Sequence, residues 1–416
     1  MIIQSLNNKL NINNIINYVI ILFILSIPFN KDITKILSLA LFILWLCEGK
    51  FKEKWNLLKS SKVVIAFVLF LIYNYISIIW SSHTISAVYY VNKYLYYLPF
   101  VLIFTSIKRQ YIKYAIIAFL VAMFTSEIIT YGIYFHYWTT HYNITHPSNS
   151  PTAFMSHTIY SAIIAFVAIL TLYKILLHKN RYLTFVYLFF YITISINLFI
   201  SGGRTGLISY IVVQLFLLFY ILKHKKKYLF VTISLIVILS ISAYKTLPVF
   251  KHRIDAGLSN INTLISHKNF NTSWGARVAM IYVGSKIIAD NPIIGVGIKD
   301  NMDEMVNYAN KTKQYNLKFL KRYHKWHFHN QYIDILTQLG IIGLILFLSI
   351  FYYLWKLKID DKELHIIKML FILHILFSII SSDLFHQKHY IYFIGLFIGL
   401  ILAQNRYEQI GIQNND

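Results

Sequence analysis

The chain has 416 residues, of which 57% are hydrophobic and only 13% are charged, against about 25% charged in an ordinary soluble domain. Its apolar runs approach the roughly 20 residues that cross a bilayer and lack the strict alternation of β-barrel strands, which excludes both a soluble domain and a barrel. A single cysteine, Cys47, excludes an internal disulfide and a zinc site built on several thiolates. The formal net charge of +23 does not indicate a nucleic-acid partner, because the basic residues lie in separate loops.

Apolar segments predict an all-α polytopic membrane protein with about 12 transmembrane helices. In chain order they lie near 14–29, 33–47, 63–80, 88–106, 112–134, 153–177, 182–200, 204–222, 228–244, 331–355, 366–381 and 389–404. The first segment is too long for the apolar part of a signal peptide and lacks a small-residue cleavage site, so we expect it to be retained. No internal repeat is visible, although secondary transporters often carry one.

The short connections between these segments alternate between basic and neutral. Lysine-rich connections lie at 50–62, 107–113, 174–181, 223–227 and 356–368. The connections between them hold one arginine, Arg204. The positive-inside rule therefore predicts cytoplasmic N- and C-termini, with the neutral connections on the outer side.

The connection over 245–330 is much longer than the others and is expected on the outer side. It carries 13 Lys and Arg residues against 5 Asp and Glu residues, but connections longer than about 60 residues are translocated largely regardless of charge. Its positive charge should attract anions. The chain thus divides into nine transmembrane helices over 1–244, a large outer loop with an amphipathic helix over 245–330, and three helices with a cytoplasmic tail over 331–416.

The sequence SGGRTG at 201–206 opens the eighth predicted span and is a candidate anion site. Its glycines allow a tight turn and a close approach of backbone to a ligand. Arg204 and Thr205 then begin a helix, whose free N–H groups act with the guanidinium on an anion. The alternative is an ordinary turn in which Arg204 extends into water.

The segment 274–297 predicts an amphipathic helix that lies against the bilayer or the other spans. Its apolar positions at helical spacing are Val278, Ile281, Tyr282 and Ile288. The sequence NPIIGVG ends this helix and turns the chain. Arg277 lies in the first turn, where the helix dipole disfavours a cation, which indicates a function. The alternative is a helix held by packing alone, with Arg277 in solvent.

Three histidines, His324, His327 and His329, stand at the mouth of the tenth predicted span. A metal site is one interpretation, but the segment lacks cysteines and has no acidic partner before Asp334. Asn330 is a candidate N-cap for the span, which would make His329 a helix-mouth residue without chemistry. The sharper hypothesis makes His329 a general base, because imidazole titrates near neutral pH.

Taken together, the SGGRTG arginine, the Arg277 helix with its NPIIGVG block and the His-Asn pair before a glycine-containing span resemble the O-antigen ligase and polymerase family of bacterial envelope enzymes. The resemblance is close over about 200–350, and the segment 299–325 departs from it. It implies a GT-C-like, metal-independent membrane glycosyltransferase without a cofactor. Arg204 and Arg277 match the family's essential arginines, and His329 matches its essential histidine.

The resemblance also implies where the protein acts and on what. It would lie in the bacterial inner membrane among membrane lipids, with a periplasmic active site, and pass a glycan from undecaprenyl diphosphate to a sugar hydroxyl of lipid A–core. Because the outer connection 135–152 holds no Lys or Arg, a ligase is favoured over a polymerase that extends lipid-linked repeat units. A polysaccharide transporter without catalysis is a third hypothesis, which predicts tolerance to loss of His329.

Other residues around these motifs are candidate substrate contacts. Thr205 and Asn330 adjoin the key residues. Lys251 and Arg253 open the large loop, where they either bind phosphate or lie in solvent. Three polar residues face the same side from the turn after the eleventh span and are candidates to line a cavity: Asp383, His386 and His389.

Overall fold

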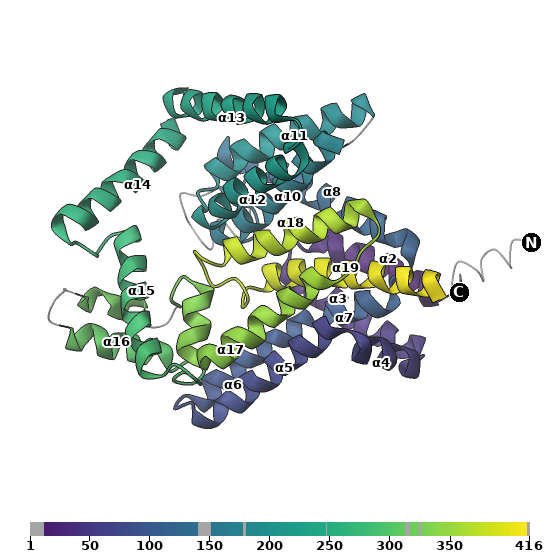
Figure 1. Cartoon of the computed structure of the whole chain (residues 1–416), viewed down its shortest axis with the longest axis horizontal. Coiled ribbons are helices and arrows are strands. Elements are labelled where there is room, and N and C mark those ends of the chain that lie inside the picture. The colour runs from purple at the N-terminus through teal and green to yellow at the C-terminus, as the bar shows by residue number, and fades with distance from the viewer. Residues whose placement is uncertain are drawn as a thin grey trace, which may run out of the picture.

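The structure is a computed structural model that describes residues 12–139, 151–177, 180–246, 248–312, 317–323 and 327–413. Within this part of the chain all regular structure is helical (Figure 1). The helices, with η marking 3-10 helices, are α2 (Ile12–Ser26), α3 (Lys31–Glu48), α4 (Phe51–Ser60), α5 (Lys62–Ile76), η1 (Ser77–Trp80), α6 (Thr84–Asn92), η2 (Lys93–Tyr97), α7 (Leu98–Ser106), α8 (Arg109–Tyr134), α10 (His157–Leu177), α11 (Arg181–Ile200), α12 (Arg204–Leu222), α13 (Lys226–Thr246), α14 (Pro248–His267), α15 (Ser273–Asp290), α16 (Asn301–Lys311), η3 (Lys318–Tyr323), α17 (Gln331–Lys356), α18 (Lys362–Ser378) and α19 (Lys388–Gln413).

Six of the described helices are long and apolar enough to cross a membrane, which supports the predicted all-helical membrane class. They are α5 with η1, α8, α10, α11, α12 and α17. The other predicted segments also hold helix, and the count of twelve spans stays a prediction. The segment 88–106 is interrupted by η2, because Pro99 in the first turn of α7 has no N–H to continue a helix from α6.

Helix α10 occupies the centre of the bundle. Its residues are buried without interruption from Ile159 to Tyr173, because it packs against α8, α11, α12, α18 and α19. A helix that is apolar on every face needs such neighbours all around. Peripheral helices instead leave apolar side chains exposed, such as Phe185 on α11 at 69%. This pattern is expected of a bundle whose outer surface faces lipid.

The chain from α13 to α16 leaves the bundle and returns to it (Figure 1). Helix α14 contacts α11, α13 and α15, and α15 in turn packs on α16 and α17. A second hydrophobic cluster, separate from the bundle core, gathers Ala279, Met280, Val283, Ile287, Met302, Met305, Ala309, Leu317, Leu320 and Phe328. The described part of 299–325 therefore forms α16 and η3, which build this small core beneath α15.

Helix α17 is bent at Gly340, whose φ of 63° is not helical. The bend frees backbone groups, and the NPIIGVG segment at 291–297 pairs with them. The backbone bonds run from the Val296 N–H to Thr337 O, from the Gly297 N–H to Gln338 O and from the Ile341 N–H to Pro292 O, at 2.9, 3.0 and 2.9 Å. A Cβ on Gly340 would lie 2.2 Å from Ile293 O, so glycine is required for this approach. The NPIIGVG segment and the first part of α17 are thereby joined into one scaffold.

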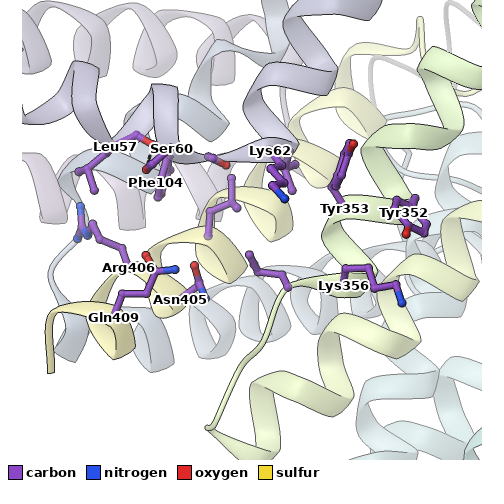
Figure 2. Close-up of a pocket in the computed structure, with 14 residues that line it drawn as sticks. Leu57, Ser60, Lys62, Phe104, Tyr352, Tyr353, Lys356, Asn405, Arg406 and Gln409 are labelled. Carbon is purple, nitrogen blue, oxygen red and sulfur yellow. Dashed lines mark hydrogen bonds between the residues drawn. The ribbon is translucent and has the colours of Figure 1, made fainter. Parts of the chain in front are cut away.

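The end of α17 away from His329 borders a cavity of about 450 Å³, which residues of α4, α5, α7 and α19 also line (Figure 2). Arg406 lies in its wall, and its guanidinium donates to the backbone oxygens of Thr105 (2.5 Å) and Ile107 (2.7 Å). These carbonyls are at the C-terminal end of α7, where a cation is favourable. Arg406 therefore caps the C-terminal end of α7.

Candidate functional site

The N-terminus of α12 lies directly against α10, and this contact positions Arg204. Gly202 has a φ of 76°, which favours glycine. A Cβ on Gly206 would lie 1.9 Å from the Ser161 backbone oxygen, so glycine also permits the close helix contact. Thr205 is buried in this interface, whereas Arg204 is half-buried. Arg204 thus stands in the first turn of a helix, where anions are favoured, although the Gly206 N–H there already donates to Ser161 Oγ (3.3 Å).

Helix α15 begins at a Thr272 cap, whose hydroxyl accepts from the Gly275 N–H (3.0 Å). Its inner face carries the buried residues Ala279, Met280, Val283 and Ile287. The apolar stripe expected from the sequence lies on the outer side of α15, with Val278 39% and Ile281 44% exposed. The inner face is buried because it packs on Met302, Met305, Leu317, Leu320 and Phe328 of the second hydrophobic cluster. Arg277 is half-buried at the edge of the inner face.

Arg277 links the three predicted catalytic residues electrostatically. Burial, and then the positive charge of Arg204, lower the pKa of Arg277, while Tyr323 acts in the opposite direction. Two guanidiniums near enough to act on one another repel, and an anion bound beside both would relieve that repulsion. The pair is therefore suited to a ligand with more than one negative charge.

His329 lies in a strained loop just before α17. Its φ of 53° is in the left-handed region, which costs a non-glycine residue about 1 kcal/mol or more. Its backbone N–H donates to Nδ1 of His327 (3.0 Å), and the two rings are 4.5 Å apart. Tyr323 meets the His329 ring edge-on at 6.0 Å. Asn330 caps α17 by accepting two backbone N–H groups, as the sequence predicted.

The surroundings keep the His329 imidazole neutral. Burial, the neighbouring His327 and the positive charge of Arg277 lower its pKa to about 3, while the carboxylate of Asp383 opposes them. A neutral imidazole can accept a proton, as a general base must, but a base with so low a pKa does so weakly. An anion beside Arg277 would offset that positive charge and raise the pKa of His329. The base would therefore strengthen when an anionic ligand binds.

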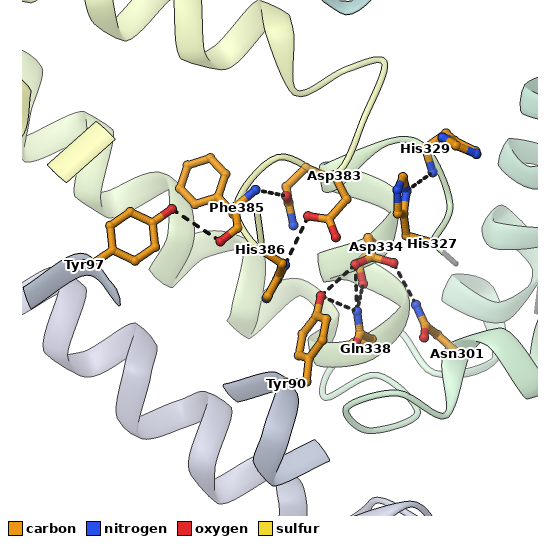
Figure 3. A network of polar contacts seen from close by, with 11 residues as sticks. Tyr90, Tyr97, Asn301, His327, His329, Asp334, Gln338, Asp383, Phe385 and His386 are labelled. Carbon is orange, nitrogen blue, oxygen red and sulfur yellow. Dashed lines mark hydrogen bonds and ion pairs between the residues drawn. The ribbon is translucent and has the colours of Figure 1, made fainter. Parts of the chain in front are cut away.

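A buried carboxylate lies next to the histidines (Figure 3). Asp334, on the first turn of α17, is only 2% exposed. It accepts hydrogen bonds from Asn301 Nδ2 (3.0 Å), the Tyr90 hydroxyl (3.1 Å) and Gln338 Nε2 (2.9 Å). A carboxylate away from water needs such donors. Because they come from α16, α6 and α17, Asp334 ties the outer region to the bundle.

Asp383 and His386 form a second buried pair in the turn before α19 (Figure 3). Nδ1 of His386 lies 3.1 Å from Oδ1 of Asp383, and the Tyr90 ring stacks on the imidazole at 3.8 Å. Burial alone would raise the pKa of Asp383, but His386 beside it holds that pKa below its usual value. Asp383 also acts on His329, so this pair belongs to the same electrostatic cluster.

Other predicted site residues lie apart from this cluster or outside the description. Lys251 is exposed on α14. The side chain of Arg253 and the whole of His324 lie outside the described residues. In the part of the chain that the structure describes, no group of three or more His, Cys, Asp or Glu side chains is arranged to hold a metal ion.

Several residues of the cluster escaped the sequence analysis. Tyr90, Tyr323 and Asn301 come from segments that carried no motif, and only the fold brings them to the histidines. A signal did exist for Gln338, because Asp334 and Gln338 are two polar residues one turn apart in an otherwise apolar span. Polar side chains in such a helix mark a functional region by default.

Residues 189–348 match a protein family described as O-antigen ligase. The matched stretch contains Arg204, Arg277 and His329. An uncharacterized protein of Haemophilus influenzae is 27% identical over 409 residues, which cover 93% of this chain and 98% of that protein. The predicted resemblance to the O-antigen ligase and polymerase family is confirmed, and members of that family are membrane glycosyltransferase-like enzymes.

Proposed function

We propose that this chain, which carries the O-antigen ligase family domain over residues 189–348, passes a glycan from undecaprenyl diphosphate to a sugar hydroxyl of lipid A–core. The apolar helices and the family support a membrane protein of lipopolysaccharide biosynthesis with lipid-linked glycan substrates. In the proposal the protein lies in the bacterial inner membrane with both termini in the cytoplasm. The Arg204, Arg277 and His329 cluster would face the periplasm.

The position of Arg277 is the observation that supports the proposal most. The positive charge of Arg204 lowers the pKa of Arg277, and the positive charge of Arg277 lowers the pKa of His329. A diphosphate bound by the two arginines would therefore lie near a neutral imidazole that can take the proton of the acceptor hydroxyl. Guanidinium groups suit this task because their planar fork makes bidentate contacts with phosphate oxygens.

The transfer would be a single displacement at the anomeric carbon of the donor. The acceptor oxygen attacks that carbon while His329 takes the hydroxyl proton. The bond between the carbon and the phosphate oxygen breaks, and its electron pair leaves with undecaprenyl diphosphate, so the anomeric configuration inverts. The transfer needs no metal ion in this scheme, because diphosphate is a good leaving group and the arginines carry its developing charge.

Binding of the donor would also make His329 a stronger base. With no anion present, the pKa of His329 is about 3, and its affinity for a proton is low. A bound diphosphate offsets Arg277 and raises that affinity. The acceptor hydroxyl would then be activated only after the donor is in place.

Reconstituted protein, a synthetic undecaprenyl-diphosphate glycan and purified lipid A–core test the proposal directly. Glycan-bearing lipid A–core and free undecaprenyl diphosphate are the expected products. Extension of a lipid-linked repeat unit instead would identify a polymerase. Movement of glycan across the bilayer without a new glycosidic bond would identify a transporter and refute the proposal.

The same distinction can be made in cells by deleting the gene and separating the envelope glycolipids on a gel. A ligase deletion should remove all polymer from lipid A–core while lipid-linked polymer accumulates. A single repeat unit left attached to lipid A–core would instead indicate loss of a polymerase.

A further inference from the structure

A cavity of about 1060 Å³ has His386, the histidine of the Asp383–His386 pair, in its wall. Its size is at the upper end of the roughly 300–1,000 Å³ that ligand pockets span. It is lined by the α2–α3 turn and the start of α3, by α6 and η2, by the chain just before α10 and by the turn before α19. His386 lies in its wall and contacts Asp383, so the cavity adjoins the candidate catalytic cluster.

Three lysines from separate parts of the chain converge on this cavity: Lys31, Lys93 and Lys388. Lys93 lies within electrostatic range of Lys388 and of the Asp383 carboxylate, and His389 lies within range of Lys31, Lys388 and Asp32. With the other described residues these three ammonium groups form no ion pair. One carboxylate, Asp32, also lines the cavity, which leaves a net positive charge. Like charges gathered in a concave site raise the local concentration of anions.

Aromatic rings and amides complete the lining. The rings of Phe29, Tyr89, Tyr96 and Phe154 border the cavity together with the amide side chains of Asn30, Asn92 and Gln387. The Lys388 ammonium lies 4.9 Å from the centre of the Tyr96 ring and the Lys93 ammonium 5.4 Å from that of Tyr89. Flat rings offer surface to the apolar faces of sugars, and the amide nitrogens offer donors to hydroxyls. The amide oxygens of Asn30 and Asn92 already accept hydrogen bonds within the protein. The combination suits a sugar that also carries acidic groups.

We propose that this cavity, which we call the lysine cavity, binds an acidic saccharide, a sugar chain bearing phosphate or carboxylate groups, as the acceptor of glycan transfer. The inference rests on the proposed function and extends it, because it separates the two substrates. The donor diphosphate lies beside Arg204 and Arg277, and the acceptor's acidic sugars lie among Lys31, Lys93 and Lys388. The buried Asp383–His386 pair adjoins the cavity through His386 and acts on His329 through Asp383.

Kinetics of reconstituted protein test the lysine cavity with two acceptors, lipid A–core in its phosphorylated form and the same material after phosphatase treatment. The Lys31→Gln, Lys93→Gln and Lys388→Gln triple variant should raise KM for the phosphorylated acceptor roughly 10- to 100-fold. Its kcat and its KM for the donor should stay unchanged, and KM for the dephosphorylated acceptor should change little. Equal KM values for wild type and variant would overturn the inference.

A matched control separates this effect from a general loss of positive charge. Lys35 is exposed one turn further along α3 and does not line the cavity, so Lys35→Gln should leave every constant unchanged. If the triple variant folds poorly, single substitutions and their Lys→Arg counterparts decide the matter. A Lys→Arg substitution keeps the positive charge and should leave the acceptor KM close to that of the wild type. If the Lys→Arg variants had the same raised KM as the Lys→Gln variants, positive charge would not explain acceptor binding, and the inference would be wrong.

An anionic phospholipid headgroup has the same chemistry and is the competing occupant. Binding of fluorescent lipid A–core oligosaccharide, measured in phosphatidylcholine nanodiscs with and without phosphatidylglycerol, distinguishes the two. Binding that needs the three lysines in neutral nanodiscs supports the acceptor, whereas stabilisation by phosphatidylglycerol that needs the lysines, with no saccharide binding, overturns it. This binding needs no turnover, so wild-type protein that binds saccharide but transfers nothing would refute the proposed function alone.

Discussion

Buried charges at the two ends of α17 are compensated in opposite ways. At the Arg406 end, each buried cation has partners within the protein. Arg406 donates to two backbone oxygens of the α7 terminus, and Lys54 pairs with Glu48 at 2.8 Å and donates to Trp45 O at 2.7 Å. The two ends are separated by 26 residues, or roughly 39 Å of helix.

At the His329 end the cations face one another. Arg204 and Arg277 repel, and the lysine cavity gathers three ammonium groups around one carboxylate. The buried carboxylates at this end, Asp334 and Asp383, bond with tyrosine, amide and imidazole groups. A protein maintains such repulsion only when the rest of the fold compensates for it, and an anionic ligand is the simplest reason to keep it. The comparison thus separates charge that holds the fold from charge that binds substrate.

Replacement of His329 should give the largest change in rate. His329→Gln removes the base and should lower kcat about 10²- to 10⁴-fold, with acceptor KM unchanged, as measured by glycan transfer with reconstituted protein. His365→Gln, a half-exposed histidine near the Arg406 end, is the control and should keep full activity. If folded His329→Gln protein transferred glycan at the normal rate, His329 would not be the general base.

Arg277→Ala should come next, with a loss of roughly 10²- to 10³-fold in kcat/KM for the donor, because one of two charge-stabilising groups is removed. Arg277→Lys keeps the charge but not the fork and should recover only part of the loss. Lys286→Ala, at an exposed position of the same helix, serves as the control. Equal activity of the alanine and lysine variants would show that the charge of Arg277 contributes nothing.

Arg406→Met tests the other side of the comparison. It leaves the Thr105 carbonyl without its donor and should lower the free energy of unfolding by about 1–3 kcal/mol, seen as a lower thermal midpoint in detergent. Transfer per folded molecule should not change. If Arg406→Met protein had normal stability but transferred no glycan, Arg406 would be needed for activity, and the contrast between the two ends of α17 would be wrong.

The pH dependence should show the smallest effect and sharpen the role of Arg277. Protonation removes the base, so activity is lost as the pH falls through the pKa of His329, which is about 3 before ligand binds. The kcat/KM for the donor, which reports the free enzyme, should therefore stay flat down to about pH 5. Because bound diphosphate raises that pKa, kcat should begin to fall at a higher pH than kcat/KM. Coincident acid limbs near the ordinary histidine pKa of about 6.5 would contradict this coupling.

Much of the local structure could be predicted because it depends on neighbouring residues. The Asn330 cap, the end of α15 at Asn291 and the helix start at Arg204 are encoded within a few positions. The buried face of α15 could not be read from hydrophobicity, since its outer stripe is just as apolar. In a membrane protein, lipid and protein neighbours both accept apolar residues, so periodicity alone does not distinguish them.

The sequence by itself determined that the chain is helical, that it is apolar enough for a membrane and that its arginine and histidine motifs follow the order of a known family. Only the tertiary structure decided which of these residues act on one another. Arg204, Arg277 and His329 are more than 50 residues apart at each step in the sequence. The elements that carry them are packed through glycines, which let α12 meet α10 and NPIIGVG meet the bend in α17. The lysine cavity is likewise invisible in the sequence, because charges from separate loops combine only when packing brings them together.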